Sequence, residues 1–144
     1  MACTARPLVN RRSLLSAGVV LAAFKAAAAP KAAPIVTVLG DSITAGLGLA
    51  EKDALPAQLQ AALGRLGVEA IVRGAGVSGD TTAGGLARLD FSVQSDTTLF
   101  VVELGGNDFL QSIPAAETRQ NLLAIISRLR RRRMKVVVCK AVPP

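Results

Sequence analysis

The sequence contains no histidine, no tryptophan and no tyrosine among its 144 residues, and only 3% of them are aromatic. The absence of histidine removes both the usual base of a serine nucleophile and the commonest metal ligand. The spacing of Cys3 and Cys139 suits neither a metal site nor a disulfide framework. The sequence therefore predicts no zinc site, and a core built from Ala, Leu, Val and Ile rather than from aromatic rings.

Acidic residues are missing from the first 29 positions, where four basic residues supply more than half of the net charge of +7. From Pro30 onward a net charge of +3 remains, and five arginines cluster between Arg128 and Arg133. This cluster could bind an anion or a nucleic acid, but it has no aromatic neighbours for base stacking. Cations at the end of a helix also interact favourably with its dipole. We therefore expect a solvated helix end and no nucleic-acid partner.

The first 29 residues have the pattern of an export signal. The pair Arg11-Arg12 precedes a modest apolar stretch from Ala17 to Phe24, and Ala26-Ala27-Ala28-Ala29 offers small residues for cleavage. The apolar stretch is much shorter than the roughly 20 residues that span a bilayer. We expect a twin-arginine-like signal peptide over 1–29, a periplasmic or secreted protein, and no stable membrane anchor after cleavage. An uncleaved N-terminal anchor is the alternative.

Apolar runs and helical spacing alternate along residues 30–144, which we expect to form the folded unit. Strands are expected over Ile35–Leu39, Val68–Val72, Thr98–Glu103 and Lys135–Cys139, and helices over Pro56–Leu66, Thr81–Leu89 and Ala115–Arg131. This alternation predicts an α/β fold with a mostly parallel sheet that is covered by helices on both faces.

Glycines and polar residues directly follow three of the expected strands. The three clusters are Gly40-Asp41-Ser42, the segment from Gly76 to Asp80, and Gly105-Gly106-Asn107-Asp108. In parallel sheets of this kind, ligands bind at the carboxyl ends of the strands. We therefore expect the three clusters to converge on one edge of the sheet and to form a single site.

Ser42 is a candidate nucleophile within this site. A serine that attacks a carbonyl needs hydrogen-bond donors aimed at the oxyanion that forms. The backbone N–H groups of Ser42 and Gly79 and the side-chain amide of Asn107 could supply them, and Gly79 lets a substrate approach the backbone closely because it lacks a Cβ. Asp41 and Asp108 are candidates for a supporting carboxylate pair. Alternatively, Ser42 only caps a helix, and each aspartate only caps a backbone N–H.

The segment from Gly74 to Gly79 also fits the G-x-G-x-x-G fingerprint of dinucleotide-binding proteins. That fingerprint normally follows the first strand, and an acid that ends a second strand comes about 20 residues later. Asp96 lies near that distance but precedes a strand instead of ending one. Nucleotide binding is therefore the weaker hypothesis, and glycines that permit a tight turn are the simpler one.

Three segments, LGDSITAGLG, GAGVSGDTTAGGLARL and VVELGGNDFL, resemble the first three conserved blocks of the SGNH (GDSL) hydrolase family. The likeness is greatest to its bacterial periplasmic arylesterase, acyl-CoA thioesterase I and lysophospholipase L1 group, and it runs from about Ile35 to Pro144. It implies a flavodoxin-like three-layer α/β/α sandwich, with Ser42 as nucleophile and Gly79 and Asn107 in the oxyanion hole. It also implies hydrolysis of small-molecule esters or thioesters without a metal or an organic cofactor.

The fourth block of the family is Asp-x-x-His, which supplies the base and the residue that orients it. The sequence has no counterpart of this block. Its last residues, CKAVPP, resemble the end of the family's fourth strand and the loop that follows it. The resemblance thus implies that 30–144 is the N-terminal part of a hydrolase domain, truncated before the last βα unit and weakly active as given. The alternative is a non-catalytic remnant of the same fold that binds lipids or acylated glycans.

Overall fold

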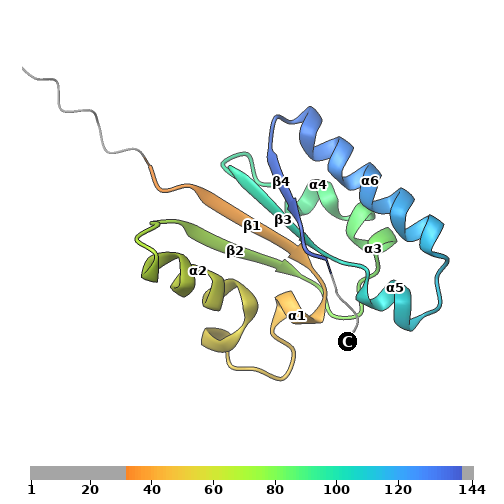
Figure 1. Ribbon diagram of the computed structural model, residues 1–144, viewed down its shortest axis with the longest axis horizontal. Coiled ribbons are helices and arrows are strands. Elements are labelled where there is room, and N and C mark those ends of the chain that lie inside the picture. Colours follow the sequence, from red (N-terminus) through yellow and green to blue (C-terminus); the bar gives the residue numbers. More distant parts are fainter. Residues whose placement is uncertain (1–31, 141–144) are drawn as a thin grey trace, which may run out of the picture. The chain divides into compact units, whose positions relative to one another are not determined.

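The computed structural model describes residues 32–140, which form a four-stranded parallel sheet with helices on both faces (Figure 1). The strands are β1 (Ile35–Gly40), β2 (Ile71–Gly76), β3 (Leu99–Glu103) and β4 (Lys135–Val138). The helices are α1 (Ser42–Ala45), α2 (Leu55–Arg65), α3 (Thr82–Ala87), α4 (Leu89–Ser92), α5 (Gly106–Leu110) and α6 (Ala115–Arg131), with a short 3-10 helix, η1, at Glu51–Asp53. The predicted signal peptide over 1–29 lies outside the described residues.

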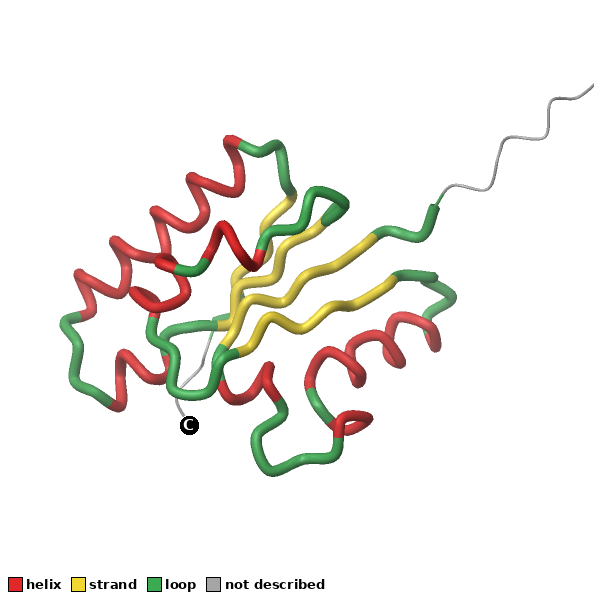
Figure 2. Tube along the Cα trace, turned by 180° about the vertical axis from the view of Figure 1, so that it is seen from behind, coloured by secondary structure: helices red, strands yellow, loops and turns green. Residues whose placement is uncertain are grey.

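The strand order is β2-β1-β3-β4, so the sheet grows outward from its first strand in both directions. Helices α1 and α2 pack against β2 on one face, whereas α3, α4 and α6 lie on the opposite face. The same division into layers is visible from behind in Figure 2. The predicted α/β fold, a parallel sheet between two layers of helices, is confirmed.

The main core lies between the central strands and α6. Helix α6 covers the residues predicted for it, and its buried Ile125 and Leu129 stand one turn apart on the face toward the sheet. The other buried members of this cluster are Leu39, Leu89, Phe100, Val102 and Leu104. Phe100 is the only aromatic residue among them, so the predicted aliphatic core is confirmed for the residues that the structure describes.

Strand β2 begins later than predicted and runs through glycines that the sequence places in a turn. The N–H of Val68 donates to the carbonyl of Leu63 at 2.9 Å, so Val68 belongs to the turn that follows α2 and not to a strand. A Cβ on Gly76 would lie 2.3 Å from the backbone nitrogen of Ala45, which means that α1 packs directly on the strand. The expectation of a strand over Val68–Val72 is therefore corrected to Ile71–Gly76.

The helix predicted over Thr81–Leu89 is divided in two. Thr81 is the N-cap of α3, with its hydroxyl oxygen accepting from the N–H of Gly84 at 3.3 Å, and Arg88 separates α3 from α4. Helices α1 and α5 were not predicted, because segments of four or five residues are too short to show helical periodicity.

The arginine cluster between Arg128 and Arg133 is exposed at the end of α6, as expected for a solvated helix end. Arg132 forms an ion pair with Asp90, which is itself exposed. No helix within residues 32–140 has both the length and the apolar character needed to cross a membrane.

Candidate active site

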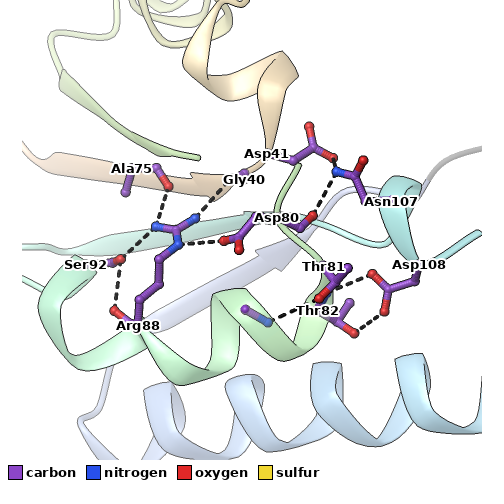
Figure 3. Close-up of polar contacts among 11 residues, drawn as sticks. Gly40, Asp41, Ala75, Asp80, Thr81, Thr82, Arg88, Ser92, Asn107 and Asp108 are labelled. Atoms are coloured by element: carbon purple, nitrogen blue, oxygen red, sulfur yellow. Dashed lines mark hydrogen bonds and ion pairs between the residues drawn. The ribbon is translucent and has the colours of Figure 1, made fainter. Parts of the chain in front are cut away.

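Strands β1, β2 and β3 end at the same level of the sheet. Gly40, the last residue of β1, is in register with Gly76 of β2 and with Glu103 of β3. The N–H of Val77 also donates to the Gly40 carbonyl at 3.1 Å, so the segments after the strands leave the sheet side by side. We call this edge, made by residues 40–44, 76–82 and 103–108, the rim. The predicted convergence of three clusters on one edge is confirmed (Figure 3).

Ser42 is the first residue of α1 and is partly exposed at the rim. Asp41 precedes it as the N-cap, and its Oδ1 accepts a hydrogen bond from the N–H of Ile43 at 3.0 Å. The hypothesis that Ser42 caps the helix is therefore wrong, because Asp41 fills that role. Neither the hydroxyl nor the backbone N–H of Ser42 has a hydrogen-bond partner among residues 32–140.

Gly79 lies in the loop between β2 and α3, where its φ of +83° requires a conformation that glycine adopts most readily. A Cβ there would meet no atom within 4 Å, so the space around this residue is open. Its backbone N–H donates to no acceptor in the part of the chain that the structure describes. Gly79 therefore offers a free donor in an exposed loop, and its role in an oxyanion hole stays a prediction.

Asn107 is the second residue of α5 and links the three segments of the rim. Its side-chain Nδ2 donates to the backbone carbonyl of Asp80 at 2.8 Å and to Oδ2 of Asp41 at 3.2 Å (Figure 3). Both amide hydrogens thus have acceptors, which the sequence did not predict. An oxyanion bound here would have to share the hydrogen that now points to Asp41, because that hydrogen bond is the longer of the two.

The glycines that fit the dinucleotide fingerprint in the sequence do not form a phosphate-binding turn. Gly74 and Gly76 are strand residues of β2, and α3 begins only at Thr82. Asp96, the candidate acid, instead accepts two hydrogen bonds from the guanidinium of Arg73, at 2.8 and 2.9 Å. These bonds lower the pKa of Asp96. The nucleotide-binding alternative loses the geometry that it needs.

A sequence profile of the GDSL-like lipase/acylhydrolase family matches residues 38–144. The chain belongs to this family. It is 42% identical over 108 residues to esterase TesA of Pseudomonas aeruginosa, and the match covers 74% of this chain and 54% of that protein. It is 37% identical over 123 residues to an arylesterase of Vibrio mimicus, a match that covers 84% of this chain and 62% of that protein.

The fold comparison agrees with the family assignment. The crystal structure of AlinE4, an SGNH-hydrolase family esterase, superposes with a TM-score of 0.75 at 40% sequence identity. The superposition covers 81% of this chain and 63% of that chain. The resemblance inferred from three short segments is confirmed, and the chain spans between half and two thirds of the length of these relatives.

Asp108, next to Asn107 in the family's third block, is almost fully buried, with 1% of its surface exposed. Its Oδ2 accepts from the N–H of Thr82 at 2.8 Å, and its Oδ1 accepts from the hydroxyls of Thr82 and of Thr118. Asp41 accepts from other donors, so no shared hydrogen bond links the two aspartates, and their role as a carboxylate pair stays a prediction. Each of them accepts from a backbone N–H, as the alternative expects, and each also accepts from a side chain. Asp108 joins α5 to α3 and α6.

Arg88, in the family's second block, was not singled out from the sequence. Its Nε donates to Oδ2 of Asp80 at 2.6 Å, and its two terminal nitrogens donate to the carbonyls of Ala75 and Gly40, each at 2.9 Å (Figure 3). One guanidinium therefore ties the ends of β1 and β2 to the loop that contains Gly79. The signal available in the sequence was an acid and an arginine on either side of a short, glycine-containing helix.

Glu103 was also missed, although an acid that ends a central apolar strand is an unusual feature. Thr44 of α1 donates its hydroxyl to Oε2 of Glu103 at 2.9 Å. Burial raises the pKa of Glu103, and the nearby Asp41 carboxylate raises it further against the opposing effect of the Thr44 hydrogen bond. A Cβ on Gly40 would lie 2.0 Å from the Thr44 oxygen, so this contact depends on glycine at the end of β1.

Proposed function

We propose that this chain carries the nucleophile and the oxyanion-binding groups of a serine hydrolase that acts on small-molecule carboxylic esters or thioesters. The observation that carries the proposal is a set of unpartnered groups at the rim. Among residues 32–140, the Ser42 hydroxyl and the backbone N–H groups of Ser42 and Gly79 have no hydrogen-bond partner. Asn107 holds the segments beside them together. A nucleophile next to free backbone donors is the arrangement that acyl transfer requires.

The reaction proceeds by two acyl transfers. The Ser42 oxygen attacks the carbonyl carbon while its proton passes to a base, and the carbonyl oxygen takes the negative charge. The N–H groups of Ser42 and Gly79, with the shared amide of Asn107, stabilise that oxyanion. Collapse of the intermediate breaks the bond to the leaving alcohol or thiol, which receives the proton. Water then attacks the acyl-serine in the same way and releases the carboxylic acid.

The usual base for such a serine is a histidine, and residues 1–144 contain none. Asp41 is a poor substitute, because its Oδ1 accepts from Ile43 and its Oδ2 accepts from Asn107. We place the base on the histidine of the family's Asp-x-x-His block, carried by polypeptide outside these residues. Without that base we expect the rate to fall by several powers of ten, with a remainder that is due to oxyanion stabilisation.

The test uses the full chain with added imidazole as an external base. The protein is incubated with p-nitrophenyl acetate, and intact-mass spectrometry followed by peptide mapping shows whether an acetyl group is bound to Ser42. Ser78→Ala is a matched control, since Ser78 is also an exposed serine of the rim. We expect acetylation of the wild type and of Ser78→Ala but not of Ser42→Ala. Asn107→Ala should slow acetylation about 100-fold, the usual effect of losing one oxyanion donor.

The second candidate is a non-catalytic protein that binds lipids or acylated glycans at the same rim. The absence of histidine from residues 1–144 favours it. Equal labelling of the wild type and Ser42→Ala in the acetylation experiment would support this candidate and would rule out a nucleophilic role of Ser42 in this chain.

We further propose that residues 1–29 direct export, so that the hydrolase unit over 30–144 acts in the periplasm or outside the cell. The pair Arg11-Arg12 before the apolar stretch supports this proposal. Residues 1–34 fused to a reporter that is active only outside the cytoplasm should give signal. Replacing both arginines by lysine should abolish the signal if export follows the twin-arginine route. A signal that survives the replacement indicates the general secretory route instead.

A further inference from the structure

Residues 77–80 form a tight turn at the rim, and this turn presents the backbone N–H of Gly79. The N–H of Asp80 donates to the carbonyl of Val77 at 3.1 Å, which closes the turn. Gly79, the third residue, has a φ of +83°, whereas Ser78 before it does not have a positive φ. A positive φ at the third position alone is the mark of a type II turn. The central peptide unit is not used to close such a turn, so its N–H, that of Gly79, remains available to bind an oxyanion.

The guanidinium of Arg88 holds both ends of this turn. At the first end, the Gly40 carbonyl accepts from the N–H of Val77 at 3.1 Å and from a terminal nitrogen of Arg88 at 2.9 Å. At the other end, Nε of Arg88 donates to Oδ2 of Asp80 at 2.6 Å (Figure 3). The side chains of Arg88 and Asp80 are only 22% and 13% exposed, so salt screens this ion pair little. The turn therefore cannot open without breaking its bonds to one buried cation.

Two further hydrogen bonds fix Arg88 itself. Its other terminal nitrogen donates to the carbonyl of Ala75 at 2.9 Å and to the hydroxyl of Ser92 at 3.1 Å. Four acceptors thus share one rigid, planar group, whose five N–H donors have a fixed arrangement. The ammonium group of lysine is a point charge with three rotatable donors and does not match this arrangement. The bonding pattern therefore depends on the shape of the guanidinium as well as on its charge.

We propose that Arg88 is a positioning residue that sets the separation of the two backbone donors of the oxyanion hole, the N–H groups of Ser42 and Gly79. Ser42 lies two residues after Gly40, which accepts from Arg88. Gly79 directly precedes Asp80, so the same guanidinium is bonded next to both donors. The inference rests on the proposed function. Such donors act only when they are already aimed at the oxyanion, and a displacement of about 1 Å can slow a reaction about 100-fold.

Arg73 provides an internal comparison, because its guanidinium also binds an aspartate. It donates to the two carboxylate oxygens of Asp96 at 2.8 and 2.9 Å. This pair joins β2 to the loop before β3 and lies outside the rim. Its side chains are also more open to solvent, at 33% for Arg73 and 48% for Asp96. Arg73→Lys is therefore a matched control, which changes the same type of ion pair away from both oxyanion donors.

The experiment measures acylation of Ser42 in the full 144-residue chain, with imidazole as the external base and intact-mass spectrometry as the readout. One substrate is p-nitrophenyl acetate, and the other is the thionoester in which sulfur replaces its carbonyl oxygen. Sulfur is a weak hydrogen-bond acceptor, so correctly placed donors favour the oxygen substrate. We expect Arg88→Lys to slow acylation by the oxygen substrate by about 10- to 100-fold and to lower the oxygen-to-sulfur rate ratio about tenfold. Arg73→Lys should change neither quantity.

The rate ratio separates positioning from a general loss of structure. A variant that is partly unfolded has fewer active molecules, which slows both substrates equally and leaves the ratio as it is in the wild type. An unchanged ratio for Arg88→Lys would therefore overturn the proposal, whatever happens to the absolute rates.

The backbone amide of Gly79 gives a second readout, which does not depend on the chemistry. Without substrate, ¹⁵N relaxation should give an order parameter of about 0.85 for Gly79 in the wild type and in Arg73→Lys, and below about 0.6 in Arg88→Lys. This loss of order without acylation of wild-type Ser42 would contradict the proposed function and support the role of Arg88 in holding the turn. Acylation of wild-type Ser42, with the ratio and the order parameter unchanged in Arg88→Lys, would support the function and overturn the inference.

Discussion

The central strand β1 and the outer strand β4 place similar residues in opposite surroundings. Val38 of β1, Val101 of β3 and Val137 of β4 are in register with one another and form one row across the sheet. Val38 is fully buried, whereas Val137 is 50% exposed in the part of the chain described. The three valines are chemically identical, so the position of the strand in the sheet determines their burial, and the apolar run around each does not.

Charged residues show a similar contrast between the rim and the periphery, by which we mean exposed positions outside the rim. Asp108 at the rim is buried and accepts hydrogen bonds from Thr82 and Thr118. Asp90 at the periphery pairs with Arg132, and 60% of its side chain is exposed. Because a buried carboxylate must have partners whereas an exposed one has water, we expect the rim to tolerate substitution far less than the periphery does.

The largest difference should come from removing each of these aspartates. Asp108→Ala leaves the N–H and the hydroxyl of Thr82 buried without an acceptor, which we expect to lower the free energy of unfolding by about 3–4 kcal/mol. Asp90→Ala breaks an exposed ion pair and should cost less than about 1 kcal/mol. Urea unfolding of the full chain, followed by circular dichroism, measures both. Equal losses would show that Asp108 does not hold the rim together.

Replacing glycine by alanine should lower the stability at the rim and raise it at the periphery. A Cβ on Gly76 would lie 2.3 Å from the backbone nitrogen of Ala45, so Gly76→Ala has to displace α1 together with Ser42. We expect a loss of about 2–3 kcal/mol. Gly64, in α2, has no atom within 4 Å of such a Cβ, and Gly64→Ala should stabilise the helix by about 0.5–1 kcal/mol. The midpoint of thermal unfolding should move down for the first variant and up for the second.

Much of the fold follows from the sequence because long elements repeat their pattern. The 17 residues of α6 have apolar positions on one face, and the apolar runs of β1 and β3 end in glycine and polar residues. In a parallel sheet those ends have to meet, so the rim was predictable without knowledge of any contact. The same logic could not predict which apolar runs stay exposed, because KVVV of β4 and IVTVL of β1 have the same character.

The missed features of the rim depend on contacts between distant segments. Arg88 donates to Gly40, 48 positions earlier, and Thr44 donates to Glu103, 59 positions later. Neither pairing leaves a periodic signal in the sequence. The extent of β2 was missed for a related reason, since glycine is unfavourable in strands and Gly76 is there because α1 packs so closely against it. Asn107 was predicted as a site residue, but its bonds to Asp41 and Asp80 were not.

Substitutions in the row of valines test the comparison between β1 and β4 directly, with a smaller expected change in stability. Val38→Ala removes apolar contacts from a fully buried site and should cost about 2 kcal/mol, the sum of the lost transfer free energy and a small cavity. Val137→Ala alters a half-exposed side chain in the same row and should change the stability by less than about 0.5 kcal/mol. Comparable losses at the two positions, measured by urea unfolding, would mean that β4 is covered in solution.

The smallest expected effect is on how stability depends on pH. The direction of this dependence should be opposite for Glu103, which ends β3, and for Asp96, which lies in the loop before β3. Burial raises the pKa of Glu103 above the ordinary 4.5, so its protonated form is favoured in the folded state. Its contribution to stability is therefore complete below pH 4.5 and is lost as the pH rises through the folded pKa. Glu103→Gln stays uncharged and can still accept from Thr44. We expect its stability relative to the wild type to increase between pH 4 and pH 7.

Asp96, in the loop before β3, provides the matched control because its pKa is shifted the other way. The hydrogen bonds from Arg73 lower the pKa of Asp96 below the ordinary 3.8. Its contribution is present above pH 3.8 and is lost as the pH falls through the lowered pKa. Asp96→Asn should therefore be least stable relative to the wild type near neutral pH and should approach it in acid. Urea unfolding at a series of pH values measures both variants. Curves that change in the same direction would show that burial does not govern the ionisation of Glu103, and the contrast between a crowded rim and an open periphery would then not extend to charge.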